Sequence, residues 1–340
     1  MTYPQLLRRS VSALTALALT VTLGGCKKNS GGKGDDNEKH IYQGFAMDAP
    51  LSVTQYGSDD FSAVKNKAAE LDDMLSAYSE NGEIAKLNTL GSAELTDTAA
   101  QLVKSSVQLY DEYGCVNPLM GNIIDLWNVM GDEPRVPDDE EIAEALHTAD
   151  ISNLELKGSS CTLSGGARLN FGATGKGFAL DEIKKVLDDE DMDCAVVSFG
   201  SSTLLYGSKP DGKPFKVSIS SPDGSGESFA DFTCGEGFVS TSGGYERFFE
   251  ADGEIYIHIF DEKTGRPVDT DLVSVTVVCQ SGILSDFLST RIFIGGSSDI
   301  DRWLDNKDIW VCAVREDGGI YCTDEMKDSL ELYYGSSFLN

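Results

Sequence analysis

Apolar residues recur at helical spacing in three stretches of the first half of the chain. Residues 61–90 show this spacing with an interruption near Ser79–Gly82, and residues 97–113 (DTAAQLVKSSVQLYDEY) show it without a break. The third stretch, residues 137–150 (PDDEEIAEALHTAD), begins with a proline and several acidic residues, as the first turn of a helix often does. We therefore predict amphipathic helices in all three.

The second half of the chain is dominated by short β-rich runs separated by Gly, Asp and Pro turns. These runs are residues 193–207, 215–222, 229–243, 254–261 and 272–280. A further helix is predicted over residues 282–295 (GILSDFLSTRIFIG). Helices first and strands later indicate an α+β fold rather than a regular doubly wound sheet.

Residues 1–25 have the features of a secretory signal peptide. Two arginines precede the apolar run Val11–Leu23, which is too short to span a bilayer. The run ends in Leu-Gly-Gly-Cys, a pattern typical of bacterial lipoproteins, so we expect Cys26 to become the lipid-modified first residue of the mature chain. A plain secretory signal with an incidental cysteine is the alternative.

Residues 26–39 are predicted to be the lipidated cysteine and a flexible tether, because residues 27–39 contain no apolar side chain. Two acyl chains on Cys26 suffice for stable anchoring. We therefore expect an extracytoplasmic protein attached to the bacterial cell membrane. The remaining residues, 40–340, are enough for one large domain or two lobes.

The formal net charge of −29 argues against nucleic acid and against an anionic membrane surface as partners. The negative charge of an anionic ligand must then be balanced within the binding site, by a metal ion, a lysine or backbone N–H groups. Eight cysteines are present, with no Cys-x-x-Cys pair and no metal-ligand spacing. The seven that follow Cys26 cannot all pair with one another, which leaves room for one or two disulfides.

A glycine-rich loop, residues 167–182 (ARLNFGATGKGFALDE), joins a strand-like run to a helix-like one. It is not a Walker A motif, because Asn170 takes the place of the first glycine and Gly177 follows Lys176. It is not the dinucleotide motif either, since Leu180 occupies the last glycine position. A helix N-terminus after such a loop can bind a phosphate, while a tight turn that needs glycine for geometry alone is the alternative.

The predicted helix over residues 282–295 carries Asp286 and Thr290 on one face, with Ser289 beside them. A carboxylate with hydroxyls is an oxygen site that Mg²⁺ accepts, and we expect Asp286 to face a cleft without a packing role. The alternative is an aspartate favoured by the helix dipole and a threonine hydrogen-bonded to its own helix.

In the strand over residues 254–261, alternation places Ile255, Ile257 and Ile259 on the core face and His258 on the other. The chain has three histidines, and His258 alone lies beside other candidate chemistry. A structural histidine is the alternative. A Ser-His-Asp hydrolase is disfavoured because Gly-x-Ser-x-Gly does not occur.

Six blocks in order resemble the FAD:protein FMN transferase family (ApbE/Ftp). They are MLSAYSENGEIAKLN, GCVNPLMGNIIDLW, LNFGATGKGFALD, VSTSGGYERFF, IHIFDEKTGRPV and VTVVCQSGILSDFLSTRIFIGG. The resemblance covers about residues 44–296 and implies one catalytic domain over residues 40–340, with two lobes around a flavin-nucleotide cleft. Family members are often lipoproteins, which agrees with the expectation for Cys26.

The resemblance also implies the site residues. FAD contacts are implied for Met47, Tyr78, Cys115, Val116, Asn117, Asn170, Lys176 and His258. Mg²⁺ ligands are implied for the carbonyl of Ala173 and for Asp286 and Thr290, with Ser289 able to contribute. Catalytic roles near the pyrophosphate are implied for His258, Asp261 and Lys176.

The implied reaction is Mg²⁺-dependent transfer of FMN from FAD to a Ser or Thr hydroxyl of an acceptor protein, with release of AMP. The acceptor is expected to be a membrane-associated or extracytoplasmic redox protein. A flavin-binding lipoprotein without chemistry and an FAD pyrophosphatase remain alternatives. This chain departs from the usual pattern at Asn170, where an acidic residue is usual, at residues 199–202 (FGSS) in place of a common Gly-Gly-Asp, and at Glu262 in place of proline.

Overall fold

The computed structural model describes residues 38–221, 227–333 and 337–338. The predicted signal peptide, Cys26 and nearly all of the predicted tether lie outside these ranges. The first described strand begins at Lys39, the last residue of the predicted tether. No helix within the described ranges is long and apolar enough to span a membrane.

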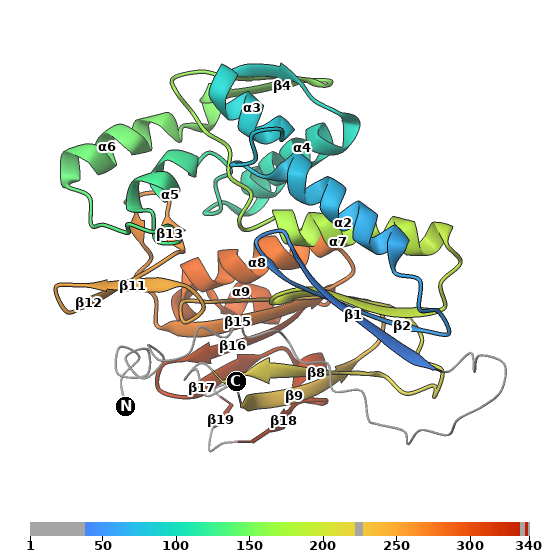
Figure 1. Ribbon diagram of the computed structural model, residues 1–340. Coiled ribbons are helices and arrows are strands. Elements are labelled where there is room, and N and C mark those ends of the chain that lie inside the picture. The colour runs from blue at the N-terminus through green and yellow to red at the C-terminus, as the bar shows by residue number, and fades with distance from the viewer. Residues whose placement is uncertain (1–37, 222–226, 334–336, 339–340) are drawn as a thin grey trace.

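A nine-stranded, almost entirely antiparallel sheet forms the centre of the fold (Figure 1). Its strand order is β1-β2-β6-β7-β10-β15-β16-β17-β19, and only the last pair is parallel. The strands are β1 (Lys39–Ala46), β2 (Ala49–Tyr56), β6 (Cys194–Phe199), β7 (Ser202–Gly207), β10 (Gly237–Gly243), β15 (Leu272–Cys279), β16 (Trp310–Arg315), β17 (Gly319–Cys322) and β19 (Ser337–Phe338). All eight residues of β15 are buried, as expected for an apolar strand covered on both faces.

Helices cover one face of this sheet (Figure 1). The described helices are α2 (Ser62–Leu75), α3 (Glu83–Leu90), α4 (Asp97–Tyr113), α5 (Gly121–Trp127), α6 (Asp139–Thr148), α7 (Gly175–Asp189), α8 (Gly282–Gly295), α9 (Asp301–Leu304) and α10 (Asp324–Lys327). Helices α7 and α8 lie nearest the sheet, with the other large helices beyond them. This stacking buries the apolar faces of both layers and positions α7 and α8 at the centre of the molecule.

Smaller sheets complete the fold. One has the order β18-β9-β8 and packs on the opposite face of the large sheet (Figure 1). Another, with the order β3-β5-β4, lies among the helices, and two hairpins extend beside them. Their bounds are β3 (Ser92–Glu94), β4 (Leu154–Lys157), β5 (Ser160–Leu163), β8 (Phe215–Ser220), β9 (Ser228–Cys234), β11 (Phe248–Ala251), β12 (Glu254–Ile257), β13 (Phe260–Asp261), β14 (Arg266–Pro267) and β18 (Glu331–Leu332).

The mixed helix-and-sheet class predicted from the sequence is confirmed. The break between α2 and α3 falls where the helical spacing was interrupted, and α4 has the bounds predicted for it. Two details are wrong: the described part of the chain begins with a β-hairpin, β1–β2, and the run 254–261 is two strands separated at His258–Ile259. The description of two lobes around a flavin-nucleotide cleft stays a prediction.

Candidate active site at the crossing of two helices

Helices α7 and α8 touch through two glycines. A Cβ atom added to Gly177 would lie 2.1 Å from the carbonyl oxygen of Gly282, and one added to Gly282 would lie 2.2 Å from the carbonyl oxygen of Gly177. Asp181 of α7 accepts hydrogen bonds from the amides of Gly282 (2.7 Å) and Ile283 (2.8 Å), so it satisfies the first turn of α8. The backbones of the glycine loop and of α8 are therefore held together at close range.

Asp286 lies at this crossing and is 4% exposed. Its Oδ2 accepts a hydrogen bond from the amide of Gly177 (2.9 Å), and its Oδ1 accepts one from Ser202 Oγ (3.0 Å). None of the ion pairs within the described ranges involves Asp286. The expectation that Asp286 has no packing role is wrong, because its carboxylate joins α7, α8 and the start of β7.

Hydroxyl groups line the same face of α8. Ser242 Oγ lies 2.8 Å from Ser289 Oγ and 3.0 Å from Thr290 Oγ1, while Ser289 also donates to the carbonyl of Asp286 (2.9 Å). Thr290 Oγ1 is 3.5 Å from that carbonyl, so hydrogen bonding within the helix occurs as well. The structure thus brings together the three α8 residues that were assigned to a metal, and Ser242 of β10 adds another hydroxyl.

These oxygens fit Mg²⁺ better than a transition metal. Ala173 lies in the turn directly before α7, on the N-terminal side of Gly177, whose amide contacts Asp286. Among the described residues, no three His, Cys, Asp or Glu side chains are grouped so that they could hold a metal. One buried carboxylate without a cationic partner, together with hydroxyl and carbonyl oxygens, is the donor set of a hard cation that keeps some of its waters.

His258 lies in the short segment between β12 and β13. Its backbone amide donates to the carbonyl of Arg247 (3.2 Å), and its Nδ1 lies 3.1 Å from the same oxygen. Burial, together with the positive charges of Arg247 and Lys176, lowers the pKa of His258 to about 4, although the contact with the Arg247 carbonyl acts in the opposite direction. His258 is therefore a neutral imidazole at neutral pH, close to the glycine-loop lysine.

Glu246 adds a carboxylate to this group. Its side chain reaches solvent, but the surrounding protein removes part of the water around the carboxylate, and this desolvation raises its pKa. The positive charges of Lys176 and Arg247 and a hydrogen bond from Ser201 lower the pKa in turn. The negative charge of Asp286 also raises it. Lys176 and Arg247 thus lie close enough to influence the pKa of both His258 and Glu246.

Asp261 has a clear local role. Its Oδ1 accepts from the amide of Lys263 (3.0 Å), and its Oδ2 accepts from Thr264 Oγ1 (3.3 Å), which shapes the turn between β13 and β14. Gly265 closes this turn with φ +63° against α6, and its carbonyl accepts from Trp127 Nε1 (2.8 Å). A catalytic role for Asp261 stays a prediction.

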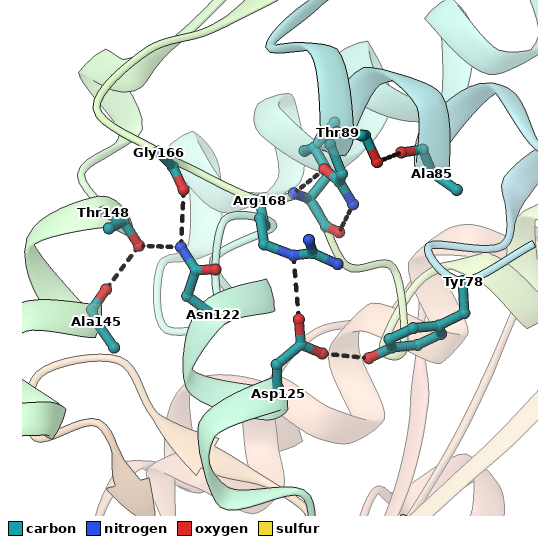
Figure 2. A network of polar contacts seen from close by, with 11 residues as sticks. Tyr78, Ala85, Thr89, Asn122, Asp125, Ala145, Thr148, Gly166 and Arg168 are labelled. Atoms are coloured by element: carbon teal, nitrogen blue, oxygen red, sulfur yellow. Dashed lines mark hydrogen bonds and ion pairs between the residues drawn. The ribbon is translucent and has the colours of Figure 1, made fainter. Parts of the chain in front are cut away.

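Tyr78 lies in a polar network at the edge of the helical layer (Figure 2). Its hydroxyl donates to Asp125 Oδ1 (2.9 Å), and Arg168 forms an ion pair with Asp125 Oδ2 (3.1 Å). Burial of the hydroxyl and the Asp125 carboxylate raise the pKa of Tyr78, while Asn170 donates a hydrogen bond to it. Two of the residues assigned to FAD, Tyr78 and Asn170, are therefore neighbours.

Met47 packs against the start of α7. Its Cε lies 3.6 Å from the position that a Cβ of Gly175 would take, and its amide donates to Asp72 Oδ1 (2.9 Å). Asp72 also lines a cavity of about 470 Å³ between the β1–β2 hairpin and α2. None of the residues assigned to FAD or Mg²⁺ lines that cavity.

A family model of the ApbE family matches residues 47–313 of this chain. The chain belongs to the ApbE family. Among similar proteins, the FAD:protein FMN transferase of Vibrio cholerae is 28% identical over 301 residues, covering 83% of this chain and 87% of that protein. The FAD:protein FMN transferase of Treponema pallidum is 32% identical over 244 residues, covering 66% and 67%.

Solved ApbE structures share the fold. The ApbE protein of Thermotoga maritima superposes with a TM-score of 0.79 at 24% identity, covering 86% of this chain and 99% of that one. The flavin transferase ApbE of Vibrio cholerae gives a TM-score of 0.76 at 23% identity, with the same coverage. Both similarities agree with the α+β architecture described above.

Each departure from the usual ApbE pattern makes a contact in this chain. Ser202 Oγ donates to Asp286 Oδ1 (3.0 Å). Glu262 accepts from the amide of Cys115 (3.2 Å), whose φ is +68°. Asn170 Oδ1 accepts from the amide of Gly172 (2.8 Å), which shapes the glycine loop.

The Cys115–Asn117 segment is held mainly by structural contacts. Asn117 is buried, with its amide group donating to the carbonyl of Ala149 (2.7 Å) and its oxygen accepting from Leu119. Val116 packs on the α8 core, and burial raises the pKa of the Cys115 thiol. Contact of this segment with FAD stays a prediction.

The candidate site contains several residues to which the sequence analysis gave no role. These are Asp181, Ser202, Ser242, Glu246 and Arg247. Glu246 and Arg247 belong to the block VSTSGGYERFF, which was noted only as part of the resemblance. The two adjacent charged residues in an otherwise small and aromatic segment were the available signal.

Proposed function

We propose that this chain transfers FMN from FAD to a Ser or Thr hydroxyl of an acceptor protein, with Mg²⁺ held by Asp286, Thr290 and the Ala173 carbonyl. The observation that carries the proposal is the convergence of the α7 N-terminus, the buried carboxylate of Asp286 and neutral His258. The names of the similar proteins, FAD:protein FMN transferase, support the same reaction.

The pyrophosphate of FAD needs positive charge in a protein of net charge −29. Lys176 supplies a cation in the first turn of α7, where the positive end of the helix dipole also favours an anion. A Mg²⁺ ion bound at Asp286 would neutralise phosphate charge and stabilise the charge that develops during transfer. Lys176 and the helix terminus thus bind and orient the phosphates.

His258 is suited to accept the proton of the attacking hydroxyl. Nδ1 faces a carbonyl oxygen, which can only accept a hydrogen bond, so Nδ1 carries the proton and Nε2 is the basic nitrogen. The acceptor oxygen forms a bond to the FMN phosphorus while the bond from that phosphorus to the bridging oxygen breaks. The hydroxyl proton passes to Nε2, and AMP leaves with the bridging oxygen.

The direct test is incubation of the protein with FAD, Mg²⁺ and an acceptor protein that bears a Ser/Thr flavinylation motif. We expect mass spectrometry to show one FMN covalently added to the acceptor and an equal amount of AMP in solution. Removal of divalent cations with EDTA should stop the reaction, and Mg²⁺ should restore it. FMN released free with AMP would identify an FAD pyrophosphatase, and bound but intact FAD would identify a flavin-binding protein.

The pH dependence of transfer should reveal the low pKa of His258. Because a lowered pKa leaves the imidazole neutral at all pH values well above it, kcat/KM should be constant through neutral pH and fall only as pH approaches about 4. Lys176→Met removes one of the charges that lower the pKa, so the acid limb should move toward pH 6.5 while the maximal rate falls. A half-maximal rate near pH 6.5 in the wild-type protein would contradict this assignment.

We further propose that Cys26 is the membrane anchor and that the acceptor is an extracytoplasmic or membrane-associated redox protein. In the cell of origin, wild-type protein should fractionate with membranes and begin at a lipidated Cys26. Cys26→Ser should leave the precursor uncut or release the protein, because both acyl chains are lost. Unmodified wild-type protein in the soluble fraction would argue for a plain secretory signal.

A further inference from the structure

Arg247 links two parts of the site that are far apart in the sequence. Its Nη2 donates to the backbone carbonyl of Asp48 (2.6 Å), and its Nη1 lies 3.2 Å from Asp48 Oδ2. Its own carbonyl accepts both contacts from His258. We propose that Arg247 is a positioning residue that fixes the tautomer and the place of His258 relative to the β1–β2 turn, an inference that rests on the proposed transferase function.

The carbonyl of Arg247 selects one form of the imidazole. Both the amide (3.2 Å) and Nδ1 (3.1 Å) of His258 point to this oxygen, which has two lone pairs and no proton. The imidazole therefore has its proton on Nδ1 and presents Nε2 as the base. This carbonyl belongs to the main chain, so its position depends on the contacts that hold the Arg247 segment in place. A substitution of the Arg247 side chain keeps the carbonyl but can change its position.

The other end of the link is a tightly specified turn. Met47 and Asp48 join β1 to β2 with φ values of +56° and +54°, a conformation that few residues other than glycine adopt. Asp72 of α2 accepts from the Met47 amide (2.9 Å), and the Met47 side chain packs beside Gly175. The turn is thus fixed to α2 and to the start of α7, which also carries Lys176.

A purely stabilising role does not explain this arrangement. The Asp48 side chain is 80% exposed and that of Arg247 is 35% exposed, and ion pairs in such surroundings add little to the free energy of unfolding. The contact instead fixes the position of the Arg247 segment relative to the β1–β2 turn. The guanidinium binds the β1–β2 turn, which packs against the start of α7, and the carbonyl of the same residue binds the proposed base.

The experiment combines a tautomer measurement with kinetics. The chain has three histidines, so ¹⁵N-histidine NMR of the wild type and His258→Gln assigns the His258 ring. At neutral pH we expect the wild type to show the Nδ1–H form alone and Arg247→Ala to show a mixture with Nε2–H. FMN transfer by Arg247→Ala should show a kcat lower by on the order of tenfold to a hundredfold, with a smaller change in KM for FAD.

Two further variants keep the test decisive. Asp48→Ala removes the carboxylate but keeps the carbonyl that Nη2 contacts, so the changes in tautomer and in kcat should have the same direction and be smaller. If Arg247→Ala does not fold, Asp48→Ala still tests the link between Arg247 and the β1–β2 turn. Arg135→Ala is the matched control, since Arg135 forms an exposed ion pair with Glu141 away from the site (2.8 Å). This control should leave the tautomer and the kinetics unchanged.

The outcomes separate the possible roles. An unchanged His258 tautomer in Arg247→Ala and Asp48→Ala overturns the proposal, and a rise in KM alone, with that tautomer unchanged, would instead identify Arg247 as a phosphate-binding residue. A changed tautomer in a protein whose wild type transfers no FMN would retain the positioning role and reject the proposed function.

Discussion

Asp286→Ala is expected to abolish FMN transfer. Mg²⁺ gains most of its binding energy from a carboxylate, and Asp286 is the one carboxylate among the residues proposed to hold it. Loss of the ion would remove several kcal/mol of transition-state stabilisation, which corresponds to more than about a hundredfold in rate. Single-turnover transfer to a motif-bearing acceptor at saturating Mg²⁺ is the measurement.

The same substitution should also lower stability. It leaves the amide of Gly177 and the hydroxyl of Ser202 without their acceptor in a buried place, at a cost of about 1–3 kcal/mol for each unsatisfied group. The sequence had indicated little change in stability, because a carboxylate on a helix face was expected to face a cleft. The melting temperature of Asp286→Ala should therefore fall together with its activity.

A matched variant separates these two effects. Asp231 of β9 is also buried (5% exposed), and its Oδ2 is contacted by Lys216 and by Tyr333 (2.6 Å) in the small sheet, away from the proposed site. Asp231→Ala should lose stability comparably but keep the transfer rate of the folded protein. Thr290→Val, which removes one neutral ligand that water can replace, should reduce the rate less than Asp286→Ala. Normal transfer by folded Asp286→Ala would reject the metal assignment.

The local pattern of apolar and polar residues was sufficient to predict most of the helices and the central strands. The capping box at Asp138 and Glu141 begins α6 where the acidic first turn had indicated a start, and the continuous apolar run 272–280 is the buried strand β15. The β1–β2 hairpin could not be recognised because its turn, Met47–Asp48, adopts positive φ values without a glycine. Contacts with α2 and α7 support this turn, and they are not visible in the local sequence.

Site residues could be predicted from the sequence where a side chain was unusual for the helix or loop that carries it. A carboxylate within an apolar helix made Asp286 a candidate, and a lysine in a glycine loop did the same for Lys176. Ser202 and Arg247 were not predictable in this way, because their partners lie 84 and 199 residues away and are brought to them by the folding of the chain. The family pattern indicated a departure at Ser202, but only the structure shows that this hydroxyl donates to Asp286.

Gly177→Ala is expected to disrupt both the fold and the site. Its Cβ would lie 2.1 Å from the carbonyl oxygen of Gly282 and 2.6 Å from Cβ of Asp286, and neither atom belongs to the flexible end of a side chain. Relief requires that α7 and α8 move apart, with a cost of roughly 1–3 kcal/mol or more. This exceeds the gain of about 1 kcal/mol that alanine brings over glycine within a helix.

The separation of the helices would also break the contact between the Gly177 amide and Asp286, so the folded fraction of Gly177→Ala should transfer FMN poorly even at high Mg²⁺. Thermal unfolding and single-turnover transfer measure the two effects on one sample. Gly235→Ala is the control, because a Cβ at that position meets no atom within 4 Å, and its melting temperature and transfer rate should match those of the wild type. If Gly177→Ala matched the wild type as well, α7 and α8 could not cross in backbone contact at Gly177 and Gly282, and the placement of Asp286 at the glycine loop would have to be abandoned.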